Sequence, residues 1–185
     1  MSDEGRLVLM FGPPGSGKST HGDLVAEKMG WDHASSGPII KEFADQELMD
    51  RFARGELATD AEINPVIDKA VRHKTAGGKT LVLDGYPRNL TQAERMLEIW
   101  PKILVAVMIR IPDEEVHARI HARNRDEGDS EEATKRRIEI FNENIEPIKK
   151  MLEDAGVIWI EVNGEASIDE VHERVMAGIK NVPNI

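Results

Sequence analysis

The chain has 185 residues, which suits one domain with a sizeable hydrophobic core. Its net charge of −10 argues against a general affinity for nucleic acid or an anionic membrane, so any site for anions must be local. The absence of cysteine excludes disulfides and thiolate-bound zinc, and no apolar run approaches the ~20 residues of a membrane span. No targeting signal is visible, so we expect a cytoplasmic protein.

The first predicted element is a buried strand at residues 7–11, which leads directly into a phosphate-binding motif. Residues 12–20 match the pattern GxxxxGK[ST], and a helical pattern that ends at Gly30 follows them. Backbone N–H groups of the glycine loop and the helix N-terminus can surround an anion. Lys18 adds charge for the outer phosphates of the ligand, and the Ser19 hydroxyl is the expected Mg²⁺ ligand. The residues expected to bind a triphosphate here are Gly15, Ser16, Gly17, Lys18, Ser19 and Thr20.

After this loop, short strands alternate with helices along the chain. Strands are predicted at residues 31–35, 80–84, 103–109 and 157–162, and helices between 37 and 76, at about 90–100 and at 168–179. The alternation predicts an α/β fold, a P-loop NTPase-type parallel sheet of about five strands with helices on both faces. Ligands of such sheets bind at the carboxyl ends of the strands. The helical stretch is long for a simple alternating fold, so we expect it to have a function.

A second motif, residues 84–92, begins where the strand at 80–84 ends. Asp84 stands where a carboxylate can reach the Mg²⁺ shell, although it could equally cap a helix. Gly85 and Pro87 bend the chain and direct Arg88 across the sheet edge, where its planar guanidinium suits phosphate oxygens. Gln92 lies one helical turn further on, and its amide can both donate and accept, as a purine edge requires. Arg88 and Gln92 could also be solvated surface residues.

A third cluster is basic, with five arginines within nineteen residues: Arg119, Arg123, Arg125, Arg136 and Arg137. Ion pairs with neighbouring carboxylates are the commoner role of any one of them, but their number in an acidic protein beside a phosphate loop favours phosphate binding. His117 and His121 could bind a metal, although no third ligand is placed and surface histidines are commoner. A helical stripe from Ile138 to Ile148 follows, and we expect Pro147 to kink or end that helix.

These three segments together resemble the adenylate kinase family, and the likeness runs through almost the whole chain. The resemblance implies reversible phosphoryl transfer between MgATP and AMP to give two ADP. It also implies one P-loop kinase domain, with a core of residues 1–35, 77–121 and 133–185, an AMP-binding insert at 36–76 and a lid at 122–132. ATP and Mg²⁺ are the implied cofactors, without zinc. We expect a monomer that binds neither nucleic acid nor membrane.

The resemblance also assigns roles to residues. Lys18 would hold the transferred phosphoryl group, Arg119 and the loop at Ala166 would flank the ATP adenine, and Arg123 would bind ATP phosphates. Arg88, Arg125 and Arg137 would gather the AMP phosphate and the charge that develops during transfer, with the alignment of Arg137 against Arg136 open by one position. The other residues implied to hold AMP are Ser36, Gly37, Lys41, Leu57, Ala58, Gly85 and Gln92.

The chain departs from the family pattern in two places. Lys41 and Pro38 replace the usual arginine and acidic residue, and since lysine lacks the bidentate fork we expect weaker AMP binding. The lid is shorter than in the short-lid members, so we expect it to exclude water less well and to permit more ATP hydrolysis. A UMP or CMP kinase is the alternative, but that subfamily usually has asparagine at the position of Gln92. A switch GTPase would need an Asn-Lys-x-Asp motif, which is absent.

Overall fold

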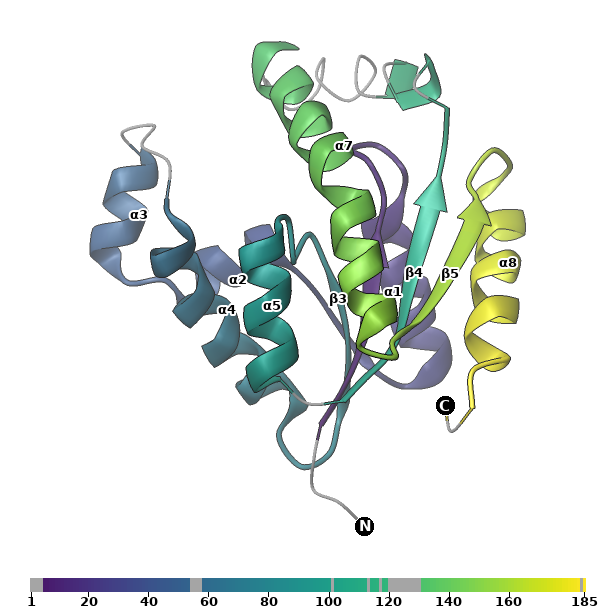
Figure 1. The fold of residues 1–185 in the computed structure, drawn as a ribbon, viewed down its shortest axis with the longest axis horizontal. Helices are drawn as coiled ribbons and strands as arrows, with labels where there is room; N and C mark the ends of the chain where they lie inside the picture. Colours follow the sequence, from purple (N-terminus) through teal and green to yellow (C-terminus); the bar gives the residue numbers. More distant parts are fainter. Residues whose placement is uncertain are drawn as a thin grey trace.

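The computed structural model describes residues 5–53, 58–100, 102–112, 114–116, 118–119, 131–183 and 185, with the backbone only at 52–53 and 131–134. Its five strands form one sheet in the order β2-β3-β1-β4-β5, and every neighbouring pair is parallel (Figure 1). The strands are β1 (Arg6–Phe11), β2 (Asp32–Ser35), β3 (Thr80–Asp84), β4 (Lys102–Arg110) and β5 (Ile158–Asn163). The predicted α/β fold with a parallel sheet of about five strands is confirmed.

Helices connect the strands and cover both faces of the sheet (Figure 1). They are α1 (Lys18–Met29), α2 (Ser36–Phe43), α3 (Gln46–Ala53), α4 (Asp60–Thr75), α5 (Leu90–Ile99), α7 (Glu131–Asp154) and α8 (Ile168–Lys180). Gly30 ends α1 in the left-handed conformation, as predicted. The stretch from 36 to 75 contains only helices in its described part, and the predicted break at Arg54 and Gly55 lies outside the described residues. None of the described helices is long and apolar enough to cross a lipid bilayer.

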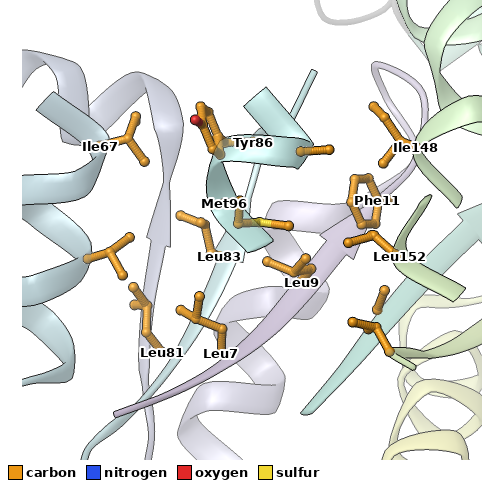
Figure 2. Close-up of a cluster of buried hydrophobic side chains, with 14 of the residues drawn as sticks. Leu7, Leu9, Phe11, Ile67, Leu81, Leu83, Tyr86, Met96, Ile148 and Leu152 are labelled. Carbon is orange, nitrogen blue, oxygen red and sulfur yellow. The ribbon is translucent and has the colours of Figure 1, made fainter. Parts of the chain in front are cut away.

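Alternate residues of the central strands bury their side chains on opposite faces of the sheet. On one face Leu7 and Leu9 of β1 pack with Ile67 of α4, Met96 of α5 and Leu152 of α7 (Figure 2). On the opposite face, Val8 and Met10 of β1 pack with Val25 of α1 and with residues of α8, which are Val171, Val175 and Ile179. The two cores fix the sheet between helical layers, so the loops at its carboxyl edge start from rigid ends.

Helix α7 does not end at Pro147, contrary to one of the two outcomes expected there, but runs on to Asp154. Proline removes one backbone hydrogen bond and crowds the preceding turn, which normally costs ~3 kcal/mol or more. Ile145, Ile148 and Leu152 around it are buried against the sheet. Burial of three aliphatic side chains, at ~1.5–3 kcal/mol each, exceeds that cost. The predicted apolar stripe of this helix is confirmed, and it holds the helix across the carboxyl edge of the sheet.

An ion-pair network joins β4, β5 and α7 on the surface. Glu161 of β5 accepts hydrogen bonds from Arg110 of β4 at 2.6 and 3.0 Å and from Lys149 of α7 at 2.7 Å. Arg110 also donates to Glu146 of α7 at 2.9 Å. The hydrogen bonds from Arg110 and Lys149 lower the pKa of Glu161 from 4.5 to about 2. The network therefore stabilises the edge strand and the helix beside it.

The depressed pKa predicts how stability depends on pH. A carboxylate with a lowered folded-state pKa stabilises the fold above its unfolded-state pKa and loses that contribution as pH falls toward the folded value. We expect Glu161→Gln to lower the free energy of unfolding at pH 6 by at most about 1 kcal/mol, because solvent screens a partly exposed pair. The difference should shrink between pH 4.5 and pH 2.

Denaturant unfolding at pH 6 and pH 3 measures how much Glu161→Gln lowers the free energy of unfolding. Glu27→Gln, on the exposed face of α1, is the matched control. A difference between Glu161→Gln and the unmodified chain that is equal at both pH values would contradict the assignment.

Candidate functional site

The glycine loop links β1 to α1 and presents the helix N-terminus to the carboxyl edge of the sheet. Gly17 forms the N-cap of α1 with φ of 86°, a left-handed conformation that glycine adopts without strain. As a glycine, this N-cap residue has no side chain with which to cap the helix, which leaves its first N–H groups for a ligand. The Ser16 hydroxyl is buried and has no hydrogen-bond partner within the described residues. This local structure is that of an anion site.

A cavity of about 600 Å³ lies beside this loop. Its walls come from the loop, the start of α2, the segment after β3 and one side of α7. The predicted site residues that line it are Gly15, Lys18, Ser19, Ser36, Gly37, Asp84, Gly85, Arg88 and Arg137. The structure thus brings together residues from four separate segments of the sequence.

Asp84 is held at the cavity by two side chains of β2. His33 Nε2 lies 2.9 Å from the Asp84 Oδ2 atom, and the Ser35 hydroxyl donates to the same oxygen at 2.7 Å. Burial raises the pKa of Asp84, but these hydrogen bonds and the charges of His33 and Lys18 bring it below its ordinary value. Burial lowers the pKa of His33, whereas its hydrogen bonds to Asp84 and Asp23 raise it, and the net direction is upward. Asp84 is therefore an anion, and both hydrogen bonds from β2 go to the same one of its two oxygens.

Arg88, in the segment after β3, supplies a positive charge to the cavity wall. Its Nε donates to the carbonyl of Gly85 at 2.7 Å, and its Nη2 donates to the Ser36 hydroxyl at 3.0 Å. The surrounding protein desolvates the guanidinium and Arg137 repels it, so the pKa of Arg88 is lowered. The hydrogen-bond partners of Arg88 in the described part of the chain are neutral oxygens. Two like charges held near each other in this way favour a bound anion.

The structure distinguishes Arg137 from its neighbour. Arg137 lines the cavity, whereas the Arg136 side chain is 65% exposed and pairs with Glu139 on α7 at 3.3 Å. Of the two alternatives that the sequence leaves open, only Arg137 is on the cavity side.

Arg119 bridges the glycine loop and a second loop after β5. It donates to the carbonyl of Gly15 at 3.4 Å and to that of Gly164 at 3.3 Å, and it pairs with Glu115 at 2.8 Å. Ala166, two residues beyond Gly164, packs partly buried against the neighbouring core. Arg119 thus contacts both the glycine loop and the segment that leads to Ala166. Arg123, Arg125, His117 and His121 lie outside the described residues.

Eight of the predicted site residues that the structure describes do not line the cavity: Ser16, Gly17, Thr20, Lys41, Ala58, Gln92, Arg119 and Ala166. Gln92 is buried, with 6% of its surface exposed, and hydrogen bonds to the backbone of Arg88 and to Asp60. Lys41 lies on the exposed face of α2, and Ala58 is half-buried before α4. Thr20 is exposed at the start of α1, and Leu57 lies outside the described residues. The structure thus brings only part of the predicted residues to the cavity.

Comparison with known proteins identifies the family of this chain. A family model described as adenylate kinase matches residues 10–157. An adenylate kinase of Thermus thermophilus is 33% identical over 190 residues, covering 96% of this chain and 98% of the relative. One from Natronomonas pharaonis is 31% identical, covering 93% and 96%, and one from Kocuria rhizophila is 30% identical, covering 94% and 98%. The chain belongs to the adenylate kinase family.

Membership in the adenylate kinase family makes the chain a phosphotransferase of the nucleoside monophosphate kinase type. It accounts for a glycine loop and an arginine-lined wall facing one cavity. The resemblance inferred from the sequence is confirmed, and the pyrimidine-kinase alternative is not favoured.

Sequence reasoning missed the two residues that hold Asp84. His33 and Ser35 stand two apart in β2, so both side chains point to one face of that strand. Ser35 lies opposite Asp84 in the register of β2 with β3. The sequence does show polar residues at alternate positions of this short strand. Only the pairing of β2 with β3 reveals that they hydrogen-bond to Asp84.

Gly85 offers a test of how tightly this adenylate kinase site is built. A Cβ atom at Gly85 would lie 2.5 Å from the Ser36 hydroxyl oxygen and 3.6 Å from Arg88 Nη2. Because Gly85 has φ of +75°, an alanine there would also be strained, by ~1–3 kcal/mol. We expect Gly85→Ala to displace Ser36 and Arg88 and to lower kcat/KM for phosphoryl transfer on the order of 100-fold.

Gly77→Ala is the matched control, since Gly77 has φ of +73° and no neighbour within 4 Å. Steady-state kinetics and thermal unfolding of both variants separate backbone strain from displacement. Equal activity of the two variants would show that a Cβ atom at position 85 does not displace Ser36 and Arg88 enough to affect phosphoryl transfer.

Proposed function

We propose that this enzyme transfers the γ-phosphoryl group of MgATP to AMP, reversibly, giving two ADP. The observation that supports this most directly is the cavity with cationic groups on different walls, Lys18 at the glycine loop, Arg88 after β3 and Arg137 on α7. An enzyme that joins two phosphate-bearing substrates needs two such walls and a space between them, whereas a nucleotide-binding scaffold needs one.

In the proposed donor site, the glycine loop and the N-terminus of α1 bind the phosphates of ATP. Gly15, Ser16, Gly17, Ser19 and Thr20 contribute backbone N–H groups or hydroxyls, and Lys18 holds the group that is transferred. The adenine would lie against Arg119, whose bonds to the carbonyls of Gly15 and Gly164 place it between that loop and the segment at Ala166. Arg123 would bind the ATP phosphates.

In the proposed acceptor site, the AMP phosphate lies between Arg88 and Arg137, with Arg125 as a third cation. Ser36, Gly37 and Gly85 line the same cavity and would surround the ribose phosphate. Gln92 would read the adenine edge, and Lys41, Leu57 and Ala58 would complete the base and phosphate contacts from the insert at 36–76. Because Lys41 is exposed in this structure, such a contact requires movement of α2.

The transfer step needs positioning and charge stabilisation rather than a covalent catalyst. An oxygen of the AMP phosphate attacks the γ-phosphorus, the bond from that phosphorus to the β–γ bridging oxygen breaks, and ADP leaves with that electron pair. Lys18, Arg88 and Arg137 would neutralise the charge on the oxygens of the transferring group. The lid at 122–132, of which residues 122–130 lie outside the described residues, would exclude water during transfer.

We also propose a Mg²⁺ ion, held by Ser19 and Asp84. Both line the cavity, and their hydroxyl and carboxylate oxygens are the hard ligands that Mg²⁺ prefers. His33 and Ser35 bond one Asp84 oxygen and leave the other for the ion or its waters. When bound, the ion would neutralise phosphate charge. Among the described residues, no group of three or more His, Asp or Glu side chains could hold a metal by itself, so the nucleotide would supply further oxygens.

A monomer suffices for this assignment, because every residue in it comes from one chain. A cytosolic location would give the enzyme access to all three adenine nucleotides.

The arginine assignment predicts that two neighbouring residues behave differently. We expect Arg137→Ala, like Arg88→Ala, to lose roughly 10³-fold in kcat while remaining folded, because a cation on the transferring group is removed. Arg136→Ala, one residue away and largely exposed, should keep nearly normal turnover. Coupled-assay kinetics and circular dichroism of the three variants measure this. Comparable losses in Arg136→Ala and Arg137→Ala would contradict the placement of α7.

Acceptor choice tests the whole proposal. Purified enzyme with MgATP is given AMP, CMP, UMP or GMP, and ADP formation is followed by chromatography. We expect selectivity for AMP of at least about 100-fold, since a site that reads the base by hydrogen bonds rejects bases that leave its groups unpaired. A no-acceptor reaction measures ATP hydrolysis, which the short lid should permit. Preference for a pyrimidine, or hydrolysis without transfer, would overturn the proposal.

A further inference from the structure

We propose that Asp60 is a specificity-determining positioning residue that fixes the orientation of the Gln92 amide, so that the acceptor site takes a 6-aminopurine and rejects a 6-oxopurine. This inference rests on the proposed role of Gln92 as reader of the acceptor base. Asp60 is the first residue of α4, and Gln92 lies in the first turn of α5, so the contact joins the helical insert to the core.

The Gln92 side chain is held at both ends of its amide. Its Nε2 donates to Asp60 Oδ1 at 2.6 Å, and its Oε1 accepts from the backbone N–H of Arg88 at 2.7 Å. The second oxygen of Asp60 accepts from the Asn89 side chain at 2.9 Å, and Asn89 caps α5 by accepting from the Gln92 backbone N–H at 2.9 Å. Asp60 and Gln92 are therefore joined directly and also through Asn89.

These partners lock the amide in one orientation. A glutamine amide is nearly symmetric in shape, so rotation by half a turn exchanges its oxygen and nitrogen at almost no steric cost. Here, rotation would place Oε1 against the Asp60 carboxylate, which only accepts, and Nε2 against the Arg88 N–H, which only donates. Both contacts would become repulsive, and Gln92 is too buried for water to replace them.

The orientation matters because the two purine classes present opposite patterns. After the bonds to Asp60 and Arg88, the amide keeps one N–H donor and one oxygen lone pair. Adenine offers an N6–H donor and an N1 acceptor on its Watson–Crick edge, while hypoxanthine offers an O6 acceptor and an N1–H donor. An amide free to rotate could bind either edge equally well. An amide fixed by a carboxylate can pair with only one of them.

The position of Asp60 in α4 is itself fixed. Thr59 caps the helix in a capping box with Glu62, whose carboxylate accepts from the Thr59 backbone and hydroxyl at 2.8 Å each. Asp60 thus starts from a defined first turn rather than from a loose loop. The negative charge of Asp60 also stabilises the N-terminus of α4. A control must therefore separate this stabilising effect from the effect of Asp60 on the orientation of the Gln92 amide.

The test is the selectivity of Asp60→Asn for AMP over inosine monophosphate. Asparagine keeps the shape but can donate as well as accept, so a rotated Gln92 is no longer repelled at that end. We expect the ratio of kcat/KM for AMP to that for inosine monophosphate to fall about tenfold, with KM for ATP unchanged. Asp60→Ser, whose hydroxyl can also donate or accept, should lower the same ratio and serves if the asparagine variant folds poorly. Asp169→Asn, in the first turn of α8, is the matched control for loss of charge at a helix N-terminus, and its ratio should not change.

The outcomes separate the two proposals. If unmodified enzyme does not prefer AMP to inosine monophosphate, the role of Gln92 as reader is wrong. Suppose that the unmodified enzyme does prefer AMP, but folded Asp60→Asn and Asp60→Ser keep the full ratio of kcat/KM for AMP to that for inosine monophosphate. The proposed role of Asp60 is then wrong, while the role of Gln92 as reader of the base is not affected. An equal loss with both acceptors would also overturn the proposed role of Asp60, because a merely structural residue lowers both alike.

Discussion

Parallel hydrogen bonding of β3 between β1 and β2 is the constraint on which the site depends. Met10 of β1 and Ser35 of β2 both lie opposite Asp84, so the glycine loop, the start of α2 and the segment after β3 all begin at one edge. A parallel register carries the carboxyl ends of neighbouring strands to the same level. The parallel register thereby brings together three segments that lie far apart in the sequence.

The site contains two arginines of like charge. Arg88 and Arg137 both line the cavity and repel each other, although the chain as a whole carries ten net negative charges. Arg88 keeps its place through neutral oxygens of Gly85 and Ser36, which orient the guanidinium without cancelling its charge. Orientation and charge are thus supplied by different groups, so the cation stays available for a ligand.

Local patterns in the sequence were sufficient to predict the glycine loop, all five strands and the stripe of α7, because each depends on residues close together in the chain. They could not predict that α7 continues past Pro147, since burial against the sheet outweighs the local cost. Nor could they choose Arg137 over Arg136, which helical spacing alone leaves equivalent. The supports of Asp84 and Gln92 come from β2 and α4, and only strand pairing and helix packing identify them.

The same limit of sequence-based prediction applies to Gln92. Its residue type suggests a role in reading a purine, but its burial and its hydrogen bond to Asp60 depend on tertiary structure. Residue type and spacing therefore could not predict that Gln92 lies behind the cavity wall, bonded to α4.

The aromatic residues have a consequence for observing this enzyme in solution. The chain has three tryptophans, and two of them pack on aromatic residues that line the cavity. Trp159 packs on Phe11 with ring centroids 5.1 Å apart, and Trp100 packs on Tyr86 at 5.3 Å. Phe11 and Tyr86 both line the cavity, at the glycine loop and beside Arg88 respectively. Single-tryptophan versions of the chain would thus carry native optical reporters, one behind the end of β1 and one behind the segment after β3, and their emission would report changes at each place separately.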